Sequence, residues 1–267
     1  MNEWLNQFFK EIEKEKYNDT VMPKMWTILD EVSEKTGFNE KEIIYLGLYG
    51  SQNYRMDTVD SNVDIECFVF PTKDDIILGK PFYSICIKTT FGTCHVKDIR
   101  AAFNELRKSS PNILEVLATP YALVNKEYFY SMKNICCHYI NYFADLNIYR
   151  LMRGLEGLYR KYQKDMATSN KAFANCIRIF NMMTGVLVGD SYTSSLVPHN
   201  YRALHDLKAS SNVDPKMREV FQCLINMRDV ELVEFYKSMK PENREDILGT
   251  INFWESELMT KYIKLEF

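Results

Sequence analysis

A short apolar run that ends in Gly-Ser places the tightest constraint on how this chain folds. Residues 43–49 read Ile-Ile-Tyr-Leu-Gly-Leu-Tyr, a run rich in the side chains that favour strands. A second run, at 63–70, stops at Pro71, which has no N–H to donate to a β-ladder. A polar loop joins the two runs. The pattern predicts two strands, the first of which ends in a tight turn at Gly50 and Ser51.

Helical periodicity dominates the rest of the chain. Apolar residues recur every three to four positions over 2–37, and shorter runs at 84–90 and 93–96 favour two more strands. Glycine and proline number only 10 and 8, which favours long helices over a turn-rich β-barrel. The later predicted helices cover 131–144, 146–164, 171–188, 199–209, 214–239 and 242–264. We therefore predict an α+β fold, with a small mixed sheet and flanking helices in residues 1–125 and a helical domain in residues 126–267.

Composition narrows the class of protein. Hydrophobic residues make up 46% and charged residues 26% of the chain, an ordinary balance for a globular protein. The net charge of −3 neither supports nor excludes RNA as a partner, since only one face of a nucleic-acid-binding protein must be basic. Seven cysteines without a C-x-x-C pair favour reduced thiols in a cytoplasmic protein, and four scattered histidines give no zinc motif. No apolar stretch reaches the roughly 18 residues of a membrane-spanning helix, so no membrane association is expected.

Spaced polar residues open the second strand. Strand alternation places Asn62, Asp64 and Glu66 on one face. Carboxylates gathered on one face are unfavourable unless a cation or a ligand neutralises them, and oxygen ligands of this kind hold Mg²⁺. Gly50 lets backbone N–H groups approach phosphate oxygens, and the Ser51 hydroxyl adds a donor. Together these residues predict a site for a divalent cation and a phosphate.

The segment from Gly50 to Asp64 also carries a longer motif, G-S-Q-N-Y-R-M-D-T-V-D-S-N-V-D. It resembles the predicted nucleotidyltransferases of the DNA polymerase beta superfamily, in the branch associated with RNA repair, which reads roughly G-S-x-x-Y-G-x-x-T-x-D-S-D-x-D. The chain matches that pattern without a gap at Gly50, Ser51, Tyr54, Thr58, Asp60, Ser61 and Asp64. Two later segments, 99–117 and 171–178, are similar to helices that follow the motif in this branch. The resemblance implies a polymerase beta-type nucleotidyltransferase core.

The resemblance also implies an activity and a set of site residues. The implied reaction moves a nucleoside monophosphate from an NTP to an acceptor hydroxyl on RNA, a protein or a small molecule, and releases pyrophosphate. Mg²⁺ or Mn²⁺ is the implied cofactor. The implied catalytic residues are Asp64, Asn62 and Glu66, of which Asp64 and Asn62 bind the metal ion. The implied nucleotide-binding residues are Gly50, Ser51, Tyr54 and Arg178.

Departures from the family pattern support a second interpretation. Asn62 replaces the first aspartate of the D-x-D, and a neutral amide oxygen lacks the charge that holds Mg²⁺ against water. The glycine after the tyrosine is Arg55, and Thr93 aligns with the third carboxylate, for which Glu66 is the candidate replacement. The alternative is a catalytically degenerate nucleotide- or RNA-binding protein of the same fold. A third possibility is a helical scaffold that binds no nucleotide.

Several other charged residues admit two interpretations. A basic row on the helix at 146–164 indicates either a solvated face or a wall for a triphosphate or RNA; it comprises Arg150, Arg153, Arg160 or Lys161, and Lys164. Arg178 lies in an apolar helix, where it is either an ion-pair partner or a phosphate clamp. Glu115 and Asn112 are expected to fix the helix turn after Pro111 rather than to take part in chemistry.

Overall fold

The computed structural model of the chain describes residues 4–6, 17–58, 61–139, 148–210, 214–238 and 244–266. Within these residues, six strands form one sheet in the order β1-β6-β2-β3-β5-β4. The strands are β1 (Trp4–Asn6), β2 (Ile43–Tyr49), β3 (Asp64–Val69), β4 (Ser84–Lys88), β5 (Thr93–Asp98) and β6 (Ala122–Asn125). β3 and β5 are parallel, and the other neighbours are antiparallel, so the predicted mixed sheet is confirmed.

Helices surround this sheet and continue beyond it. The earlier ones are α1 (Tyr17–Thr36), α2 (Lys73–Ile77), α3 (Ile99–Leu106), α4 (Pro111–Ala118) and α5 (Phe129–Lys133), with a 3₁₀ turn at Lys126–Tyr128 before α5 and a π-helical turn at Asn134–Tyr139 after it. The later ones are α7 (Ile148–Gln163), α8 (Asn170–Leu187), α9 (Tyr192–Leu196), α10 (Tyr201–Ala209), α11 (Pro215–Ser238) and α12 (Arg244–Glu266). The fold is α+β with a helical C-terminal part, as predicted.

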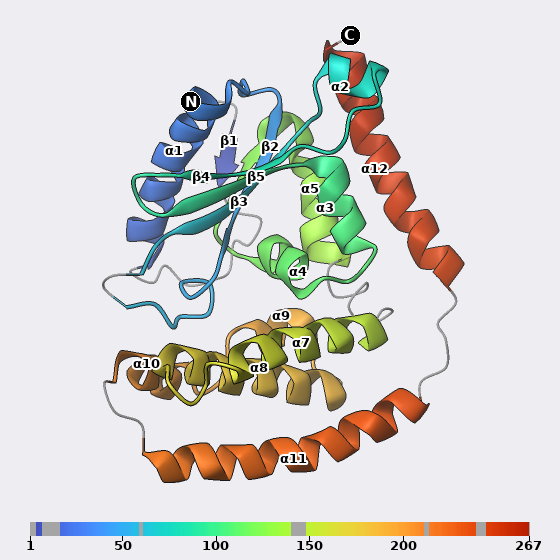
Figure 1. Ribbon diagram of the computed structural model, residues 1–267. Helices are drawn as coiled ribbons and strands as arrows, with labels where there is room; N and C mark the ends of the chain where they lie inside the picture. The colour runs from blue at the N-terminus through green and yellow to red at the C-terminus, as the bar shows by residue number, and fades with distance from the viewer. Residues whose placement is uncertain are drawn as a thin grey trace.

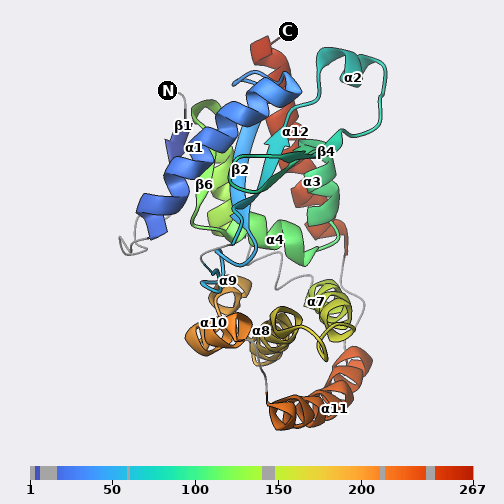
Figure 2. The ribbon, with the colours of Figure 1, turned by 60° about the vertical axis from the view of Figure 1, so that its left-hand side comes forward.

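The two faces of the sheet pack against different helices (Figures 1 and 2). α1 covers one face, where Val32 of the helix and Ile65 of β3 belong to one buried apolar cluster. α3, α4 and α5 cover the other face, where Phe68 of β3 is buried. Because side chains alternate along a strand, Asp64 and Glu66 lie on the same face as Phe68. The predicted placement of these two carboxylates on one face is therefore confirmed.

The helical layer lies beyond one end of the sheet. It comprises α7, α8, α9 and α10, and α11 lies outside it (Figures 1 and 2). α12 returns to pack beside α3. There the rings of Phe70 and Tyr262 stack with centroids 4.1 Å apart, and Arg107 pairs with Glu255. The last helix therefore packs on the sheet-bearing part, which a single boundary near residue 125 does not anticipate.

The N-terminal segment differs from the prediction of one helix over 2–37. Trp4–Asn6 forms a strand instead and pairs with β6, because a sheet edge offers backbone hydrogen bonds that helical periodicity does not reveal. α1 begins at Tyr17, and residues 7–16 of the predicted helix lie outside the described residues. The end of the helix is as predicted, since Gly37 has a φ of +77°, the left-handed conformation of a C-cap glycine.

The elements that carry the site lie where the sequence pattern places them. β2 coincides with the predicted strand at 43–49, and β3 falls within 63–70. Asp98 caps α3 by accepting a hydrogen bond from the N–H of Arg100, and Pro111 begins α4. In the part of the chain that the structure describes, no helix is both long and apolar enough to cross a membrane.

Candidate functional site

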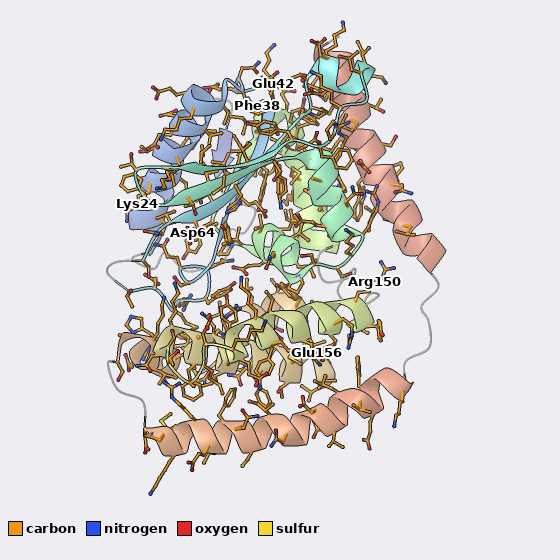
Figure 3. All side chains as sticks on the ribbon, viewed as in Figure 1. Lys24, Phe38, Glu42, Asp64, Arg150 and Glu156 are labelled. Atoms are coloured by element: carbon orange, nitrogen blue, oxygen red, sulfur yellow. The ribbon has the colours of Figure 1, made fainter. Side chains whose placement is uncertain are left out.

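A cavity of about 540 Å³ lies between the end of the sheet and the helical layer. The side chains and backbone that line it belong to Tyr49, Gly50, Ser51, Tyr54, Met56, Asp64, Glu66, His95, Lys97, Glu105, Asn112, Glu115, Val116, Leu158, Lys161, Tyr162, Lys171, Asn175, Arg178 and Lys208. Figure 3 shows Asp64 toward the end of the sheet that faces the helical layer. The Gly50–Ser51 turn and Asp64 thus meet in one cavity, as the sequence motif predicts.

Glu115 of α4 anchors the Gly50–Ser51 turn. Gly50 has a φ of +88°, a conformation that glycine adopts readily, and it donates its N–H to Glu115 Oε1 at 2.6 Å. The Tyr54 hydroxyl donates to Glu115 Oε2. The Gly50 N–H is therefore occupied within the protein, which differs from its predicted role toward phosphate. The Ser51 hydroxyl lines the cavity, and among the described residues it has no hydrogen-bond partner.

Tyr54 and Arg178 form a stacked pair in the cavity wall. The Arg178 guanidinium carbon lies 3.6 Å from the centroid of the Tyr54 ring, and the Arg178 residue is only 4% exposed. Burial raises the pKa of the Glu115 carboxyl, and the nearby Arg178 charge opposes that rise. Burial likewise raises the pKa of the Tyr54 hydroxyl. Arg178 thus supplies positive charge from a fixed position, and Glu115 has a larger role than the predicted one of fixing a helix turn.

Asp64 lies beside the turn and is held by a hydroxyl. Thr93 Oγ1, on the neighbouring parallel strand, donates to Asp64 Oδ1 at 2.8 Å. The other oxygen, Oδ2, lies 3.6 Å from the point that a Cβ on Gly50 would occupy. Thr93, which aligns with the family's third carboxylate, thus donates a hydrogen bond to Asp64 and adds no second negative charge.

Glu66 is paired with a lysine. Lys97 of β5 forms ion pairs with Glu66 and with Glu105 of α3, the latter at 2.8 Å. Burial lowers the pKa of Lys97, but the two carboxylates outweigh burial and raise it, so the ammonium group is charged at neutral pH. Burial raises the pKa of Glu66, with Lys97 acting against the rise. Glu66 therefore does not offer the free carboxylate that a replacement metal ligand requires.

Asn62 stands apart from the cavity. It precedes the first residue of β3, its side chain is exposed, and it is not among the residues that line the cavity. Strand alternation does not extend to it, because the strand begins at Asp64. The predicted metal site requires Asn62 beside Asp64 in the cavity, and the structure does not place Asn62 there.

The donor set fits a divalent metal centre poorly. Asn62 lies outside, Glu66 is bound to a lysine, and Thr93 provides a hydroxyl. Among the described residues, no group of three or more acidic, histidine or cysteine side chains is arranged to hold a metal ion. Two-metal chemistry uses several carboxylates to hold the ions, and among the described residues of the motif Asp64 is the one unpaired carboxylate that lines the cavity.

Three lysines line the opposite side of the cavity. Lys161 belongs to α7, Lys171 to α8 and Lys208 to α10. In the part of the chain that the structure describes, none of them forms an ion pair with a carboxylate. Lys208 donates to the carbonyl oxygen of Met56 at 2.8 Å, and burial together with Lys171 lowers its pKa. The cavity therefore has a cationic side that faces Asp64.

Only part of this cationic side was predicted from the sequence. Lys161 is the member of the predicted basic row that lines the cavity, whereas Lys171 and Lys208 were not predicted. A usable signal was the spacing of Lys171, Asn175 and Arg178 at i, i+4 and i+7, which places all three on one face of α8.

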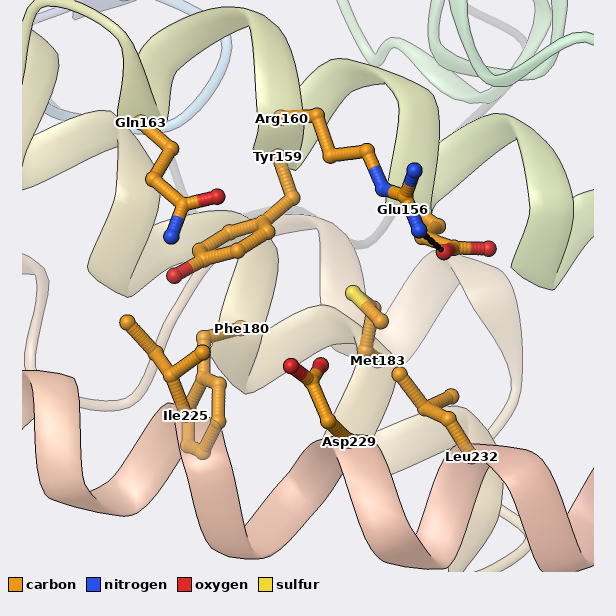
Figure 4. Close-up of a pocket in the computed structure, with 9 residues that line it drawn as sticks. All are labelled: Glu156, Tyr159, Arg160, Gln163, Phe180, Met183, Ile225, Asp229 and Leu232. Carbon is orange, nitrogen blue, oxygen red and sulfur yellow. Dashed lines mark hydrogen bonds and ion pairs between the residues drawn. The ribbon is translucent and has the colours of Figure 1, made fainter.

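A second pocket, of about 290 Å³, opens between α7, α8 and α11 (Figure 4). It is lined by Glu156, Tyr159, Arg160, Gln163, Phe180, Met183, Ile225, Asp229 and Leu232. Glu156 pairs there with both Arg153 and Arg160, so these members of the basic row are engaged on the helix surface. Tyr159 and Asp229 extend toward the pocket from opposite helices (Figure 4). The turn, the strand carboxylate and the lysines all lie in the cavity at the sheet end, which is therefore the candidate site.

The candidate site is supported by the cavity geometry and by the sequence motif, since comparisons with family models and with curated proteins found no match. No protein-family model matches the chain, and no curated protein is significantly similar to it.

Proposed function

We propose that this chain binds a nucleoside triphosphate in the cavity at the sheet end, as a nucleotidyltransferase-like protein of the polymerase beta type. The observation that carries the proposal is that the Gly50–Ser51 turn and Asp64 face three lysines across one cavity. A polyphosphate binds where cationic groups and hydroxyl donors converge, and both are present here. The cavity volume of about 540 Å³ falls within the range of roughly 300–1,000 Å³ that is typical of ligand pockets.

The conformation of Arg55 supports the family resemblance. The family has glycine at this position, and Arg55 has a φ of +59°, in the left-handed region that favours glycine. The Arg55 guanidinium carbon lies 5.6 Å from the centroid of the Tyr201 ring on α10. This contact connects the loop after Gly50–Ser51 to the helical layer, on the other side of the cavity.

A thermal-shift assay with ATP, GTP, CTP and UTP tests the proposal. A ligand present at 100 times its Kd stabilises the folded state by about 2.7 kcal/mol, which raises Tm by several degrees. At least one of the four nucleotides is expected to give such a rise, and Lys171→Met is expected to reduce it. Lys164→Met is the matched control, because Lys164 is exposed and does not line the cavity. No rise with any nucleotide would favour the helical scaffold instead.

A transferase is the second candidate, and the state of Asp64 favours it. Asp64 has no ion-pair partner in the described part of the chain, Thr93 holds one of its oxygens, and Asp64 lines the same cavity as Ser51. Incubation with labelled NTPs, pooled RNA and Mg²⁺ or Mn²⁺ distinguishes the two candidates. Labelling that Asp64→Ala abolishes would establish the transferase, whereas a binding protein labels no acceptor. If the wild type labels no acceptor, Asn62→Asp is not expected to gain labelling either, because position 62 does not line the cavity.

We also propose a cytoplasmic location. Six cysteines in the described part of the chain are free thiols, four of them buried, and thiols stay reduced in that compartment. Cell fractionation with antibody detection tests this proposal, and recovery in an oxidising compartment would contradict it.

A further inference from the structure

We infer that the cavity holds a polyphosphate through the protein's own cations and needs no divalent metal ion to do so. This inference rests on the proposed function and names how the same site recognises its ligand. The related nucleotidyl-transfer chemistry neutralises phosphate charge with metal ions bound to carboxylates. The residues of this cavity do not fit that scheme.

Lys97 is already paired with two of the carboxylates that line the cavity, Glu66 and Glu105. Its ammonium group pairs with Glu66 and lies 2.8 Å from Glu105 Oε1. Lys97 and Glu66 are 9% and 8% exposed, so the pair is buried. A metal ion that took Glu66 as a ligand would have to separate this pair and place a divalent charge beside a buried ammonium group, which is strongly unfavourable.

The charge balance of the cavity favours an anion over a bare cation. Four carboxylates and five lysine or arginine side chains line it. Lys97 is shared by two of the carboxylates, and the charge of Arg178 acts on Glu115. Asp64 is left to face the three lysines of the helical layer. These ammonium groups come from three helices and converge on one space, so together they match the several negative charges of a polyphosphate.

Isothermal titration calorimetry with ATP and with inorganic tripolyphosphate tests the inference on the full chain. Both ligands are expected to bind in EDTA, and Mg²⁺ is expected to leave Kd within about threefold or to weaken binding, because it neutralises phosphate charge that the lysines recognise. Binding that requires Mg²⁺, or that Mg²⁺ tightens more than about tenfold, would overturn the inference and leave the proposed function intact. No binding of ATP or of the other three nucleotides in either buffer would overturn the proposed function itself.

Two variants sharpen the outcome. Asp64→Asn removes the negative charge that faces the lysines, so it is expected to leave binding in EDTA unchanged or tighter, whereas a metal-mediated site would lose affinity. Lys171→Met is expected to weaken binding of both ligands about tenfold, as the loss of a charge-assisted hydrogen bond does, and Lys164→Met to have no effect. Recognition through the phosphates would be contradicted if Lys171→Met left ATP binding unchanged and tripolyphosphate did not compete with ATP. Lys97→Met also removes a cation from the cavity but disturbs a buried pair, so the Asp64 and Lys171 variants decide the question.

Discussion

Removal of the Glu115 carboxylate is expected to destabilise the turn on which the site depends. In the folded chain one oxygen of Glu115 accepts the Gly50 N–H at 2.6 Å and the other accepts the Tyr54 hydroxyl. The side chain also provides a negative charge near Arg178, which is 4% exposed. Glu115→Ala removes all three interactions and leaves Tyr54 and Arg178 buried and Gly50 half-buried without this partner.

The size of the effect follows from those partners. A buried donor without an acceptor costs about 1–3 kcal/mol, and the substitution creates one at Tyr54 and a half-buried one, which costs less, at Gly50. Loss of the opposite charge near a buried guanidinium adds to this, up to about 3–5 kcal/mol for a close pair. Water can enter from the adjoining cavity and satisfy part of the loss, so we expect the free energy of unfolding to fall by about 4 kcal/mol in total.

Urea denaturation followed by circular dichroism measures this change. Glu115→Gln keeps an acceptor for the Gly50 N–H, so it is expected to lose roughly half as much stability. Asp64→Ala is the control in the same cavity, because Asp64 is half-buried and accepts one hydrogen bond from Thr93. This substitution is expected to change the free energy of unfolding by about 1 kcal/mol or less. If Glu115→Ala stays within about 1 kcal/mol of the wild type, Glu115 does not anchor the turn.

Three further predictions concern packing and pH. A Cβ on Gly47 would lie 2.8 Å from a backbone carbonyl oxygen of α4, so Gly47→Ala should lower the free energy of unfolding by about 2 kcal/mol in urea denaturation. Gly157→Ala is the control and should not lower it, because no atom lies within 4 Å of the Cβ that would be added. Equal effects of the two substitutions would contradict the packing at Gly47. Tyr262→Ala removes a buried ring stacked on Phe70, so it should lower the free energy of unfolding by about 3 kcal/mol and speed hydrogen exchange of the amides in α12. An unchanged exchange rate would show that the stacked rings do not hold α12 on the sheet-bearing part. Because burial raises the folded-state pKa of Glu115, the part of the stability that is linked to its proton is full below the unfolded pKa, about 4.3, and is lost as pH rises through the folded value. The wild type should therefore lose stability relative to Glu115→Gln as pH rises from about 4 to 7, and a constant difference would refute the raised pKa.

Local sequence patterns predict the strands of the site because their signals are local. The apolar run at 43–49 and the alternation after it were sufficient to predict β2 and β3 and to place Asp64 and Glu66 on one face. The Gly50–Ser51 turn was predicted in the same way. Residues close in sequence share one backbone geometry, so such patterns indicate their relative positions.

Contacts between distant elements could not be predicted in this way. Glu115 reaches the Gly50 N–H across 65 positions of sequence, and Lys97 reaches Glu66 only through the register of two parallel strands. Alternation alone could not show that Glu66 is neutralised, nor that Asn62 falls before the strand begins. These long-range contacts decide which charges in the cavity remain available to a ligand.

A crystal structure with a non-hydrolysable NTP analogue and Mn²⁺ tests the central claim most directly, because anomalous scattering locates the manganese independently of the phosphates. We expect the phosphates to lie between Ser51 and Lys171, in contact with the lysines of the helical layer, whether or not a single manganese ion lies at Asp64. An analogue bound elsewhere, or phosphates held by two manganese ions and out of reach of Lys171, would contradict it.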